Sequence, residues 1–353
     1  MIKNFFLKPI LIVGVGITLL LILKHFYLNN QKNGFSRNIV EPKLKLKNAI
    51  QMSDNIIFVG YNNQYVVIQL LKDKFHLIKT DDDLKKIDTI DLKMPKGLHT
   101  ESNIYSGSLA TNIYLSNPYS DVVKFKENNV ELYKIKKLRF DFFKPISENS
   151  IITRAQTSEN HDRRRELVKI DLKDDETNRK NFIIPKQVDG FFCNDGWLHY
   201  DKGIESIFYM YFYRGLVLCL DTNLNLKYKL KTIDTVTKAA IKIGLYKEKL
   251  KDGSSISRIT QTTPTELTNR YLTTYEDKIY ILSGLKADND LTTEFNKNQP
   301  IDVYSINNGK YLYSFYIPKY KEQKVNFFQI KKNKIIAIFG TNLVTFDLKG
   351  HLI

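Results

Sequence analysis

Four polar residues, Arg154, Asn194, Asp195 and Arg270, offer this chain its best prospect of a ligand-binding site. Arg154 and Arg270 could clamp a carboxylate, because a guanidinium group presents paired, coplanar donors that match two carboxylate oxygens. The alternative is that all four side chains only line or plug a central channel. Their chemistry therefore depends on the fold that positions them.

Two acidic segments could supply oxygen ligands to a cation such as calcium. Residues 81–83 are three consecutive aspartates, and Asp288, Asp290 and Glu294 lie close together further along the chain. Both segments lack the ligand spacing and the central glycine of the EF-hand loop. We therefore expect no metal at either segment.

Motifs for catalysis are absent from the sequence. No two of the six histidines stand at zinc-ligand spacing, and neither cysteine has a partner motif nearby. The nucleophile elbow, the phosphate-binding loop and the dinucleotide fingerprint are all missing. We expect no cofactor. An enzyme would instead need polar groups with perturbed pKa values clustered at the mouth of a channel.

Two further segments have both a chemical and a structural interpretation. Residues 161–165 (HDRRR) could bind a phosphate or an acidic partner, or could form an exposed hairpin loop. Residues 208–213 (FYMYFY) could form an aromatic binding surface, or could pack in the core on both faces of a strand. We favour the structural interpretation of both segments.

The elements that must position these residues follow one repeated pattern. An alternating strand, an Asp or Asn, a polar turn and a second strand recur through the chain. The turns after the third strand of each repeat lie near Asp81, Glu127, Asp171, Asp221, Asn307 and Asp347. Most are 40 to 50 residues apart, the length of a four-stranded blade, so the sequence predicts an all-β, six-bladed β-propeller over residues 43–353.

Two features complete the predicted ring. The last repeat ends after three strands, and the alternating residues 43–50 (KLKLKNAI) are expected to supply its fourth strand, which removes an open sheet edge. One long interval contains an insertion at about residues 234–267, which could hide a seventh blade. We expect its residues 237–250 to form a helix or an irregular arm instead.

Not every repeat shows four strands. The second and third repeats yield three each, starting at residues 112 and 150, and the fourth starts with residues 190–193. This places Cys193 on a first strand and Cys219 on a third strand, which are not neighbours. We therefore expect two free, buried thiols rather than a disulfide.

The strand–Asp–turn–strand pattern over residues 43–353 resembles six-bladed propellers of the TolB-like and NHL-like kind. It is similar in particular to the Lys-, Asn- and Ile-rich, membrane-anchored propellers of Bacteroidetes. This resemblance implies a scaffold, a ligand binder or an enzyme. No family motif is matched, so it transfers no active-site residue.

The N-terminus predicts a membrane anchor. Residues 9–23 are uncharged, and residues 5–28 reach spanning length if Lys8 and Lys24 extend to the two interfaces. No small-residue cleavage site follows, so residues 1–28 are expected to be an uncleaved signal-anchor, with an exposed linker at residues 29–42. We expect the propeller on the periplasmic side of the cytoplasmic membrane, since long domains translocate regardless of flanking charge.

The net charge of +16 has no nucleic-acid-binding module beside it, so we expect no nucleic acid partner. The sequence favours a binding module for a protein partner or an envelope ligand. Two alternatives stay open: an enzyme with its site at the channel mouth, and a structural subunit of a membrane complex.

Overall fold

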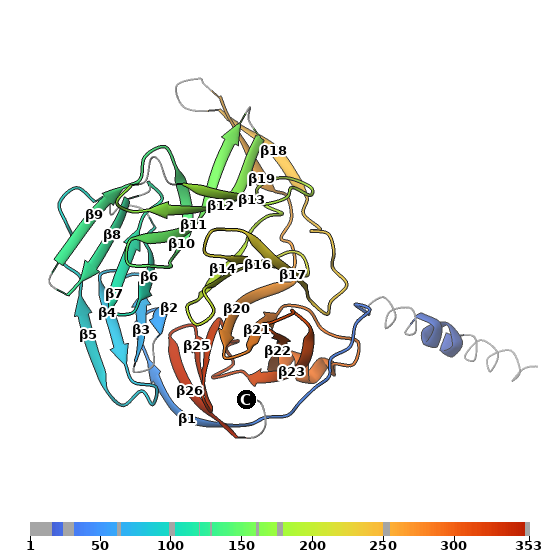
Figure 1. Cartoon of the computed structure of the whole chain (residues 1–353). Helices are drawn as coiled ribbons and strands as arrows, with labels where there is room; N and C mark the ends of the chain where they lie inside the picture. The colour runs from blue at the N-terminus through green and yellow to red at the C-terminus, as the bar shows by residue number, and fades with distance from the viewer. Residues whose placement is uncertain are drawn as a thin grey trace, which may run out of the picture.

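Six four-stranded antiparallel sheets stand around a central axis in this computed structural model (Figure 1). The chain is a six-bladed β-propeller, which confirms the fold predicted from the repeats. The structure describes residues 16–23, 32–61, 65–98, 103–119, 121–127, 129–159, 162–174, 179–249 and 255–349.

The first three blades follow one another along the chain, each with its first strand innermost. Blade one contains β2 (Ile56–Tyr61), β3 (Val66–Leu70), β4 (His76–Thr80) and β5 (Ile87–Asp91). Blade two contains β6 (Tyr105–Leu109), β7 (Asn112–Ser116), β8 (Asp121–Lys126) and β9 (Asn129–Lys134). Blade three contains β10 (Arg139–Pro145), β11 (Ser150–Glu159), β12 (Asp162–Asp171) and β13 (Lys180–Ile183).

The last three blades complete the ring. Blade four contains β14 (Gly196–Asp201), β15 (Ser206–Tyr211), β16 (Leu216–Asp221) and β17 (Leu226–Lys231). Blade five contains β20 (Asn269–Tyr275), β21 (Lys278–Ser283), β22 (Asn298–Ser305) and β23 (Tyr311–Pro318), with the short helix α2 (Thr292–Lys297) before β22. Blade six contains β24 (Phe327–Lys331), β25 (Lys334–Phe339), β26 (Asn342–Lys349) and β1 (Lys43–Gln51).

The ring closes through the pairing of the two ends of the propeller. β1 runs antiparallel to β26, from Lys43 opposite Lys349 to Gln51 opposite Asn342. The predicted role of residues 43–50 is therefore confirmed. Closure supplies hydrogen-bond partners to the backbone of β26, which would otherwise be an open sheet edge.

Ion pairs fasten the closed seam between blades six and one. Lys47 of β1 lies 2.9 Å from Asp83, Lys334 also contacts Asp83, and Lys331 lies 2.6 Å from Asp82. Hydrogen bonds from Lys334 and Lys47 lower the pKa of Asp83 to about 2. Lysines thus compensate the acidic residues 81–83, which the sequence offered as a cation site.

The expected exposed linker is in fact docked on blade five from residue 33 onward. Phe35 and Arg37 are buried, and Arg37 donates to Asp302 at 2.8 Å and pairs with Asp290. The backbone amide of Asn33 donates to Asp288 at 2.7 Å. The second acidic segment therefore binds the chain's own N-terminal arm. The composition suggested a loop, but it did not reveal a buried partner for Arg37.

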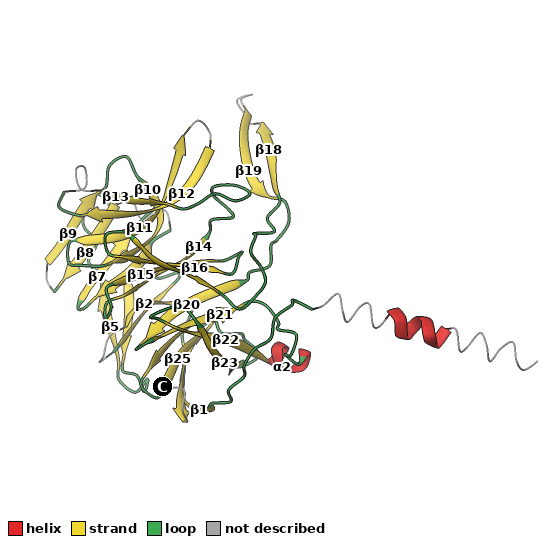
Figure 2. Ribbon diagram, turned by 45° about the vertical axis from the view of Figure 1, so that its right-hand side comes forward, coloured by secondary structure: helices red, strands yellow, loops and turns green. Residues whose placement is uncertain are grey.

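The insertion also differs from the helix or irregular arm expected at residues 237–250. β18 (Ile243–Lys249) and β19 (Ser255–Gln261) form an antiparallel hairpin that projects from the body (Figure 2). The alternation of Ile243 and Leu245 suits a strand, and the sequence Asp252-Gly253 between the strands is a hairpin turn signal. It forms a two-stranded sheet rather than a seventh blade.

The aromatic segment and the cysteines lie in the core, as expected. Phe208, Tyr209, Met210 and Tyr211 of β15 are buried on both faces, where blade four packs against its neighbours. Both cysteines are free and buried. The predicted first strand at residues 190–193 is wrong, however. β14 takes that place, and Cys193 lies in the segment before it.

Most of the predicted membrane anchor, residues 1–28, lies outside the described residues. Residues 16–23 are helical. The exposed large apolar side chains of this helix are Ile17, Leu19, Leu20, Leu21, Ile22 and Leu23. Within the parts of the chain that the structure describes, no helix has both the length and the apolar character needed to cross a membrane.

Candidate functional site

A cavity of about 1100 Å³ occupies the centre of the propeller. Its walls come from the innermost strands β2, β6, β10, β14, β20 and β24, which lie beside one another around the ring. Small-molecule sites in proteins are concave, mostly apolar and of comparable size. The centre of the ring is therefore the candidate site.

Aromatic rings from successive blades form one continuous surface in this cavity, called here the aromatic belt. Tyr105, Phe142, Trp197, Tyr271 and Phe327 come from blades two to six. Ring centroids are 6.4 Å apart between Tyr105 and Phe142, 5.1 Å between Phe142 and Trp197, 4.8 Å between Trp197 and Tyr271, and 5.4 Å between Tyr271 and Phe327. The belt can stack a flat or apolar ligand.

Lys144 places an ammonium group beside the belt. It stands two residues after Phe142 on β10, so both side chains point to the same face of the blade. Its Nζ lies 5.5 Å from the ring centre of Phe142 and 5.8 Å from that of Trp197. Burial lowers the pKa of Lys144 to about 8, and no described acidic side chain opposes that shift.

His199 is another group of the cavity whose pKa lies far from its ordinary value. Its Nε2 lies 2.9 Å from Oγ1 of Thr274 on blade five. Burial first, and then the positive charge of Lys144, lower the pKa of His199 to about 4, against a smaller opposite effect of Asp201. At neutral pH the imidazole is therefore uncharged, and it can donate or accept one hydrogen bond at each nitrogen.

The remaining polar groups of the belt differ in whether they have partners. Gln329 donates to the Tyr271 hydroxyl at 2.8 Å and accepts from Thr273 at 2.8 Å. By contrast, the buried Nε1–H of Trp197 finds no acceptor among the described residues. This nitrogen has almost no accessible surface, so its missing hydrogen bond is a cost to the fold and not a contact offered to a ligand.

The structure brings two of the four sequence-predicted residues together, but outside the cavity. Arg154 on β11 donates to Asp141 at 2.8 Å and to the Gly196 carbonyl at 2.6 Å, and it pairs with Asp195. Arg165 lies 2.7 Å from Asp141. These four charged side chains, Arg154, Arg165, Asp141 and Asp195, form the arginine–aspartate cluster between blades three and four.

The other two predicted residues lie apart from each other. Asn194 is buried and accepts a hydrogen bond from Arg214 at 3.2 Å. Arg270 is exposed at the irregularity between Asn269 and Tyr271 that interrupts the pairing of β20 with β21. None of the four lines the central cavity, and ligand binding by them stays a prediction.

The basic residues 161–165 are only partly the exposed loop that was favoured. His161 lies outside the described residues, and Arg163 to Arg165 belong to β12. Arg165 is buried, and the guanidinium groups of Arg163 and Arg165 lie 4.0 and 4.1 Å from the ring centre of Phe191. These arginines therefore help to join blade three to the segment before β14.

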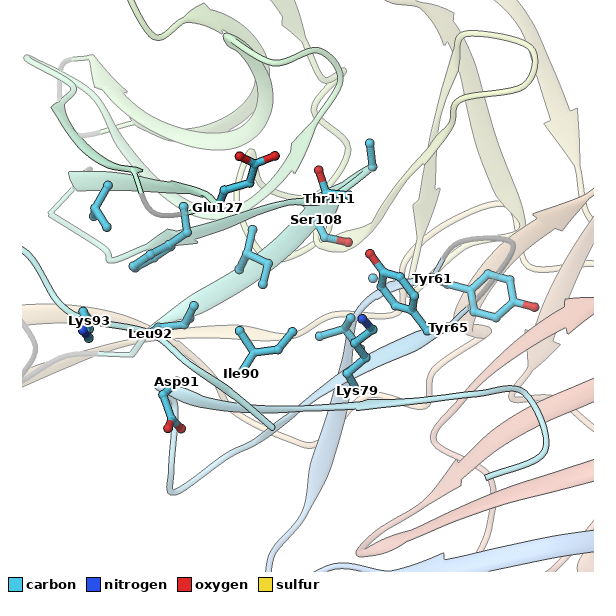
Figure 3. A pocket seen from close by; sticks show the side chains of 16 residues that line it. Tyr61, Tyr65, Lys79, Ile90, Asp91, Leu92, Lys93, Ser108, Thr111 and Glu127 are labelled. Atoms are coloured by element: carbon cyan, nitrogen blue, oxygen red, sulfur yellow. The ribbon is translucent and has the colours of Figure 1, made fainter. Parts of the chain in front are cut away.

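A second cavity of about 620 Å³ lies between blades one and two (Figure 3). Gly60, Tyr61, Ser108 and Ala110 line both cavities, so the second one extends the first outward. Gly60 is needed at this junction, since an added Cβ would lie 1.5 Å from the Ser108 hydroxyl oxygen. Figure 3 shows Lys79 beside Tyr65, with its Nζ 4.3 Å from the ring centre.

Sequence reasoning missed Lys144, His199 and the aromatic belt. A usable signal was present, because at least one aromatic residue occurs on the innermost strand of each of blades two to six. That signal is visible only once β6, β10 and β14 have been assigned. The sequence analysis had assigned none of these three strands.

No protein-family model matches the chain, and no curated protein matches it either. Among solved structures it is similar to a member of the DUF4221 family from Bacteroides vulgatus, with 12% identity and a TM-score of 0.55 over 89% of this chain and 99% of that one. It also matches BamB from Moraxella catarrhalis, with 9% identity and a TM-score of 0.42 over 86% and 99% of the two chains. The Neurospora crassa Pan2 WD40 domain matches with 10% identity and a TM-score of 0.45 over 89% and 98%. The first likeness supports the propeller fold.

Proposed function

We propose that this propeller is a binding module whose central cavity holds a small organic anion with an aromatic or apolar body. The observation that carries the proposal is the ammonium of Lys144, which faces the cavity beside Phe142 and Trp197 without a described acidic partner. An uncompensated charge in a poorly solvated site is costly. A bound anion removes that cost, and its apolar body gains contact with the aromatic belt.

The geometry also suggests how such a ligand is oriented. Its anionic group lies against Lys144, and its apolar body stacks on the rings of Phe142 and Trp197. A charge-assisted hydrogen bond contributes about 1.5–3 kcal/mol, which corresponds to roughly a tenfold to hundredfold change in affinity. Ligands that lack the charge should therefore bind much more weakly.

The fluorescence of Trp197, the only tryptophan of the chain, gives a direct test. We would titrate full-length protein in lipid nanodiscs with indole-free probes: 2-naphthoate as the anion and 2-naphthamide as its neutral counterpart. We expect 2-naphthoate to quench Trp197 with at least about tenfold higher affinity. Lys144→Met should remove that preference, and Lys229→Met, a change at an exposed lysine of β17, should keep it. Equal affinities of the two probes for the wild type would contradict the proposal.

We also propose that residues 1–28 anchor the chain in the cytoplasmic membrane and that the propeller lies on the periplasmic side. The apolar run of residues 9–23 and the exposed apolar side chains of helical residues 16–23 support the anchor. Protease added to intact spheroplasts should digest the propeller, and deletion of residues 1–28 should release it from alkali-washed membranes. Protection from the protease would place the propeller on the other side.

A second candidate function is docking of a protein partner through the β18–β19 hairpin. Leu245 and Tyr246 are more than half exposed there, at 62% and 57%, although isolated two-stranded sheets are only marginally stable in water. A partner strand added to the hairpin edge would cover them. In this case, replacing residues 243–261 by a short glycine linker abolishes stoichiometric crosslinking in membranes and leaves the thermal midpoint of the propeller unchanged.

A further inference from the structure

We propose that Lys144 captures aromatic aldehydes covalently, as an imine, in the central cavity. This inference rests on the proposed function, because it requires that aromatic ligands enter the same cavity. It goes beyond that function, because anion binding needs only the charge of Lys144, whereas imine formation needs its amine as a nucleophile.

The surroundings of Lys144 distinguish it from the two most deeply buried lysines of the described structure. Lys124 lies 2.9 Å from Glu131, and Lys331 lies 2.6 Å from Asp82. Each of these two ammonium groups therefore forms an ion pair with a carboxylate. Lys144 instead has the faces of two aromatic rings as neighbours. Lys144 also lines the central cavity, which gives a ligand a route to it.

The protonation state of Lys144 supports the same conclusion. Burial lowers its pKa to about 8. At pH 7.5 about a quarter of such amines are neutral, whereas an ordinary lysine with a pKa near 10.4 is neutral in only about one molecule in a thousand. Desolvation of a lysine in an apolar pocket is a known way to activate this nucleophile.

None of the neighbouring groups named below holds Lys144 in an ion pair. The pKa of His199 responds to the charge of Lys144, but the imidazole itself is uncharged at neutral pH. Asp201 lines the cavity but accepts hydrogen bonds from the backbone amides of Gly203 and Ile204. Glu276, on the turn after β20, is exposed. These positions leave the lone pair of Lys144 available.

The proposed reaction needs no oxidant and no reductant. The Nζ lone pair attacks the carbonyl carbon, and the π electrons of the C=O bond move to oxygen, which takes up a proton lost by nitrogen. The nitrogen lone pair then forms the C=N bond as the C–O bond breaks, and the hydroxyl group leaves as water with the second proton, which comes from the nitrogen and leaves a neutral imine. The planar imine of an aromatic aldehyde remains conjugated with its ring, and it can stack on Phe142 or Trp197.

The test uses the full chain in nanodiscs with 2-naphthaldehyde as the probe and sodium cyanoborohydride to reduce any imine. Mass spectrometry of the digested protein then measures the adduct on every lysine. We expect Lys144 to be modified at least tenfold faster than the exposed lysines, with Lys124 as an unreactive buried reference. Lys144→Met should lose the fast adduct, whereas Lys229→Met should keep it on Lys144.

Binding of unreactive 2-naphthoate, followed by Trp197 quenching, separates the two proposals. If 2-naphthoate binds and Lys144 is labelled no faster than the exposed lysines, the imine proposal is overturned and the anion-binding function stands. If neither 2-naphthoate binding nor a fast adduct is observed, both proposals fail. A fast adduct that survives in Lys144→Met at another lysine also overturns the imine proposal.

Discussion

Blade three carries two cations on neighbouring strands in opposite electrostatic settings. Arg154 on β11 has two carboxylates, Asp141 and Asp195, whereas Lys144 on β10 has none among the described residues. Burial acts to lower the pKa of Arg154, but Tyr209, Asp195 and Asp141 together raise it above its ordinary value. For Lys144 burial acts alone, and its pKa falls.

The difference separates a structural charge from a charge available to a ligand. The arginine–aspartate cluster is satisfied by the protein itself, and it joins β10 and β11 of blade three to the segment that enters blade four. No acidic side chain among the described residues pairs with Lys144, so burial of its charge lowers the stability of the fold. Groups with such uncompensated perturbations concentrate at functional sites.

The largest expected effect in this comparison comes from removing the compensated cation. Arg154→Met leaves Asp141 and Asp195 with Arg165, at 2.7 and 3.7 Å, as their only close cation among the described residues. Removing one partner of an ion pair is strongly destabilising when the pair is buried, and here Arg154 is 11% exposed while the two carboxylates are 33% and 30% exposed, so the effect lies at the lower end of the range for such pairs. We expect the free energy of unfolding to fall by about 3 kcal/mol, measured by urea denaturation at pH 7.

Arg270→Met is the matched control for that measurement. The same arginine-to-methionine change at this exposed position should alter the free energy of unfolding by less than about 0.5 kcal/mol. Equal effects of the two substitutions would mean that the arginine–aspartate cluster does not stabilise the fold.

Removing the uncompensated cation should have the opposite sign. The pKa of Lys144 is about 8 in the folded chain, against an ordinary value of 10.5, and one pKa unit corresponds to about 1.4 kcal/mol. Lys144→Met should therefore stabilise the protein by about 1–3 kcal/mol at pH 7, since the burial of a charge is removed. Urea denaturation of the two proteins measures this difference.

The pH dependence sharpens that prediction. Between about pH 8 and pH 10.5 the unfolded chain holds the Lys144 proton and the folded chain releases it, so stability rises with pH in this window. The advantage of Lys144→Met should thus shrink to about 1 kcal/mol at pH 10. A difference that stays constant from pH 7 to pH 10 would show that the charge of Lys144 is not the cause.

The sequence predicted the ring better than its centre, and the reason is physical. The middle strands of the blades carry apolar runs because neighbouring blades cover both of their faces, and an unpaired edge on β26 required a partner such as residues 43–50. The unassigned strands β6, β10 and β14 face the cavity. Their sequences YSGSL, RFDFFKP and GWLHYD mix polar, aromatic and charged residues, which breaks the apolar alternation.

The candidate site was missed for a related reason. Arginines and aspartates attract notice in a sequence because they make strong interactions, but only the structure shows that Arg154 and Asp195 make them with each other. Lys144 is a candidate binding residue because it lacks an acidic partner, and no sequence pattern shows that such a partner is missing. The same limit hid the buried pairing of Arg37 with blade five.

The smallest expected effect tests whether the charge of Lys144 reaches across the cavity to His199. Desolvation is the main cause of the low pKa of His199, and the positive charge of Lys144 is the second. Because Lys144 is fully charged below pH 7, Lys144→Met should raise the pKa of His199 from about 4 while leaving it below the ordinary value of 6.5. Titration of the histidine Cε1–H signals by NMR measures this pKa, with His199→Gln to assign the resonance.

In the wild type the unfolded chain binds more protons between about pH 4 and pH 6.5, so stability falls as the pH falls through this window. The fall should be shallower in Lys144→Met. An unchanged His199 pKa would mean that the charge of Lys144 is screened or compensated, and it would remove the contrast with Arg154 on which the proposed site depends.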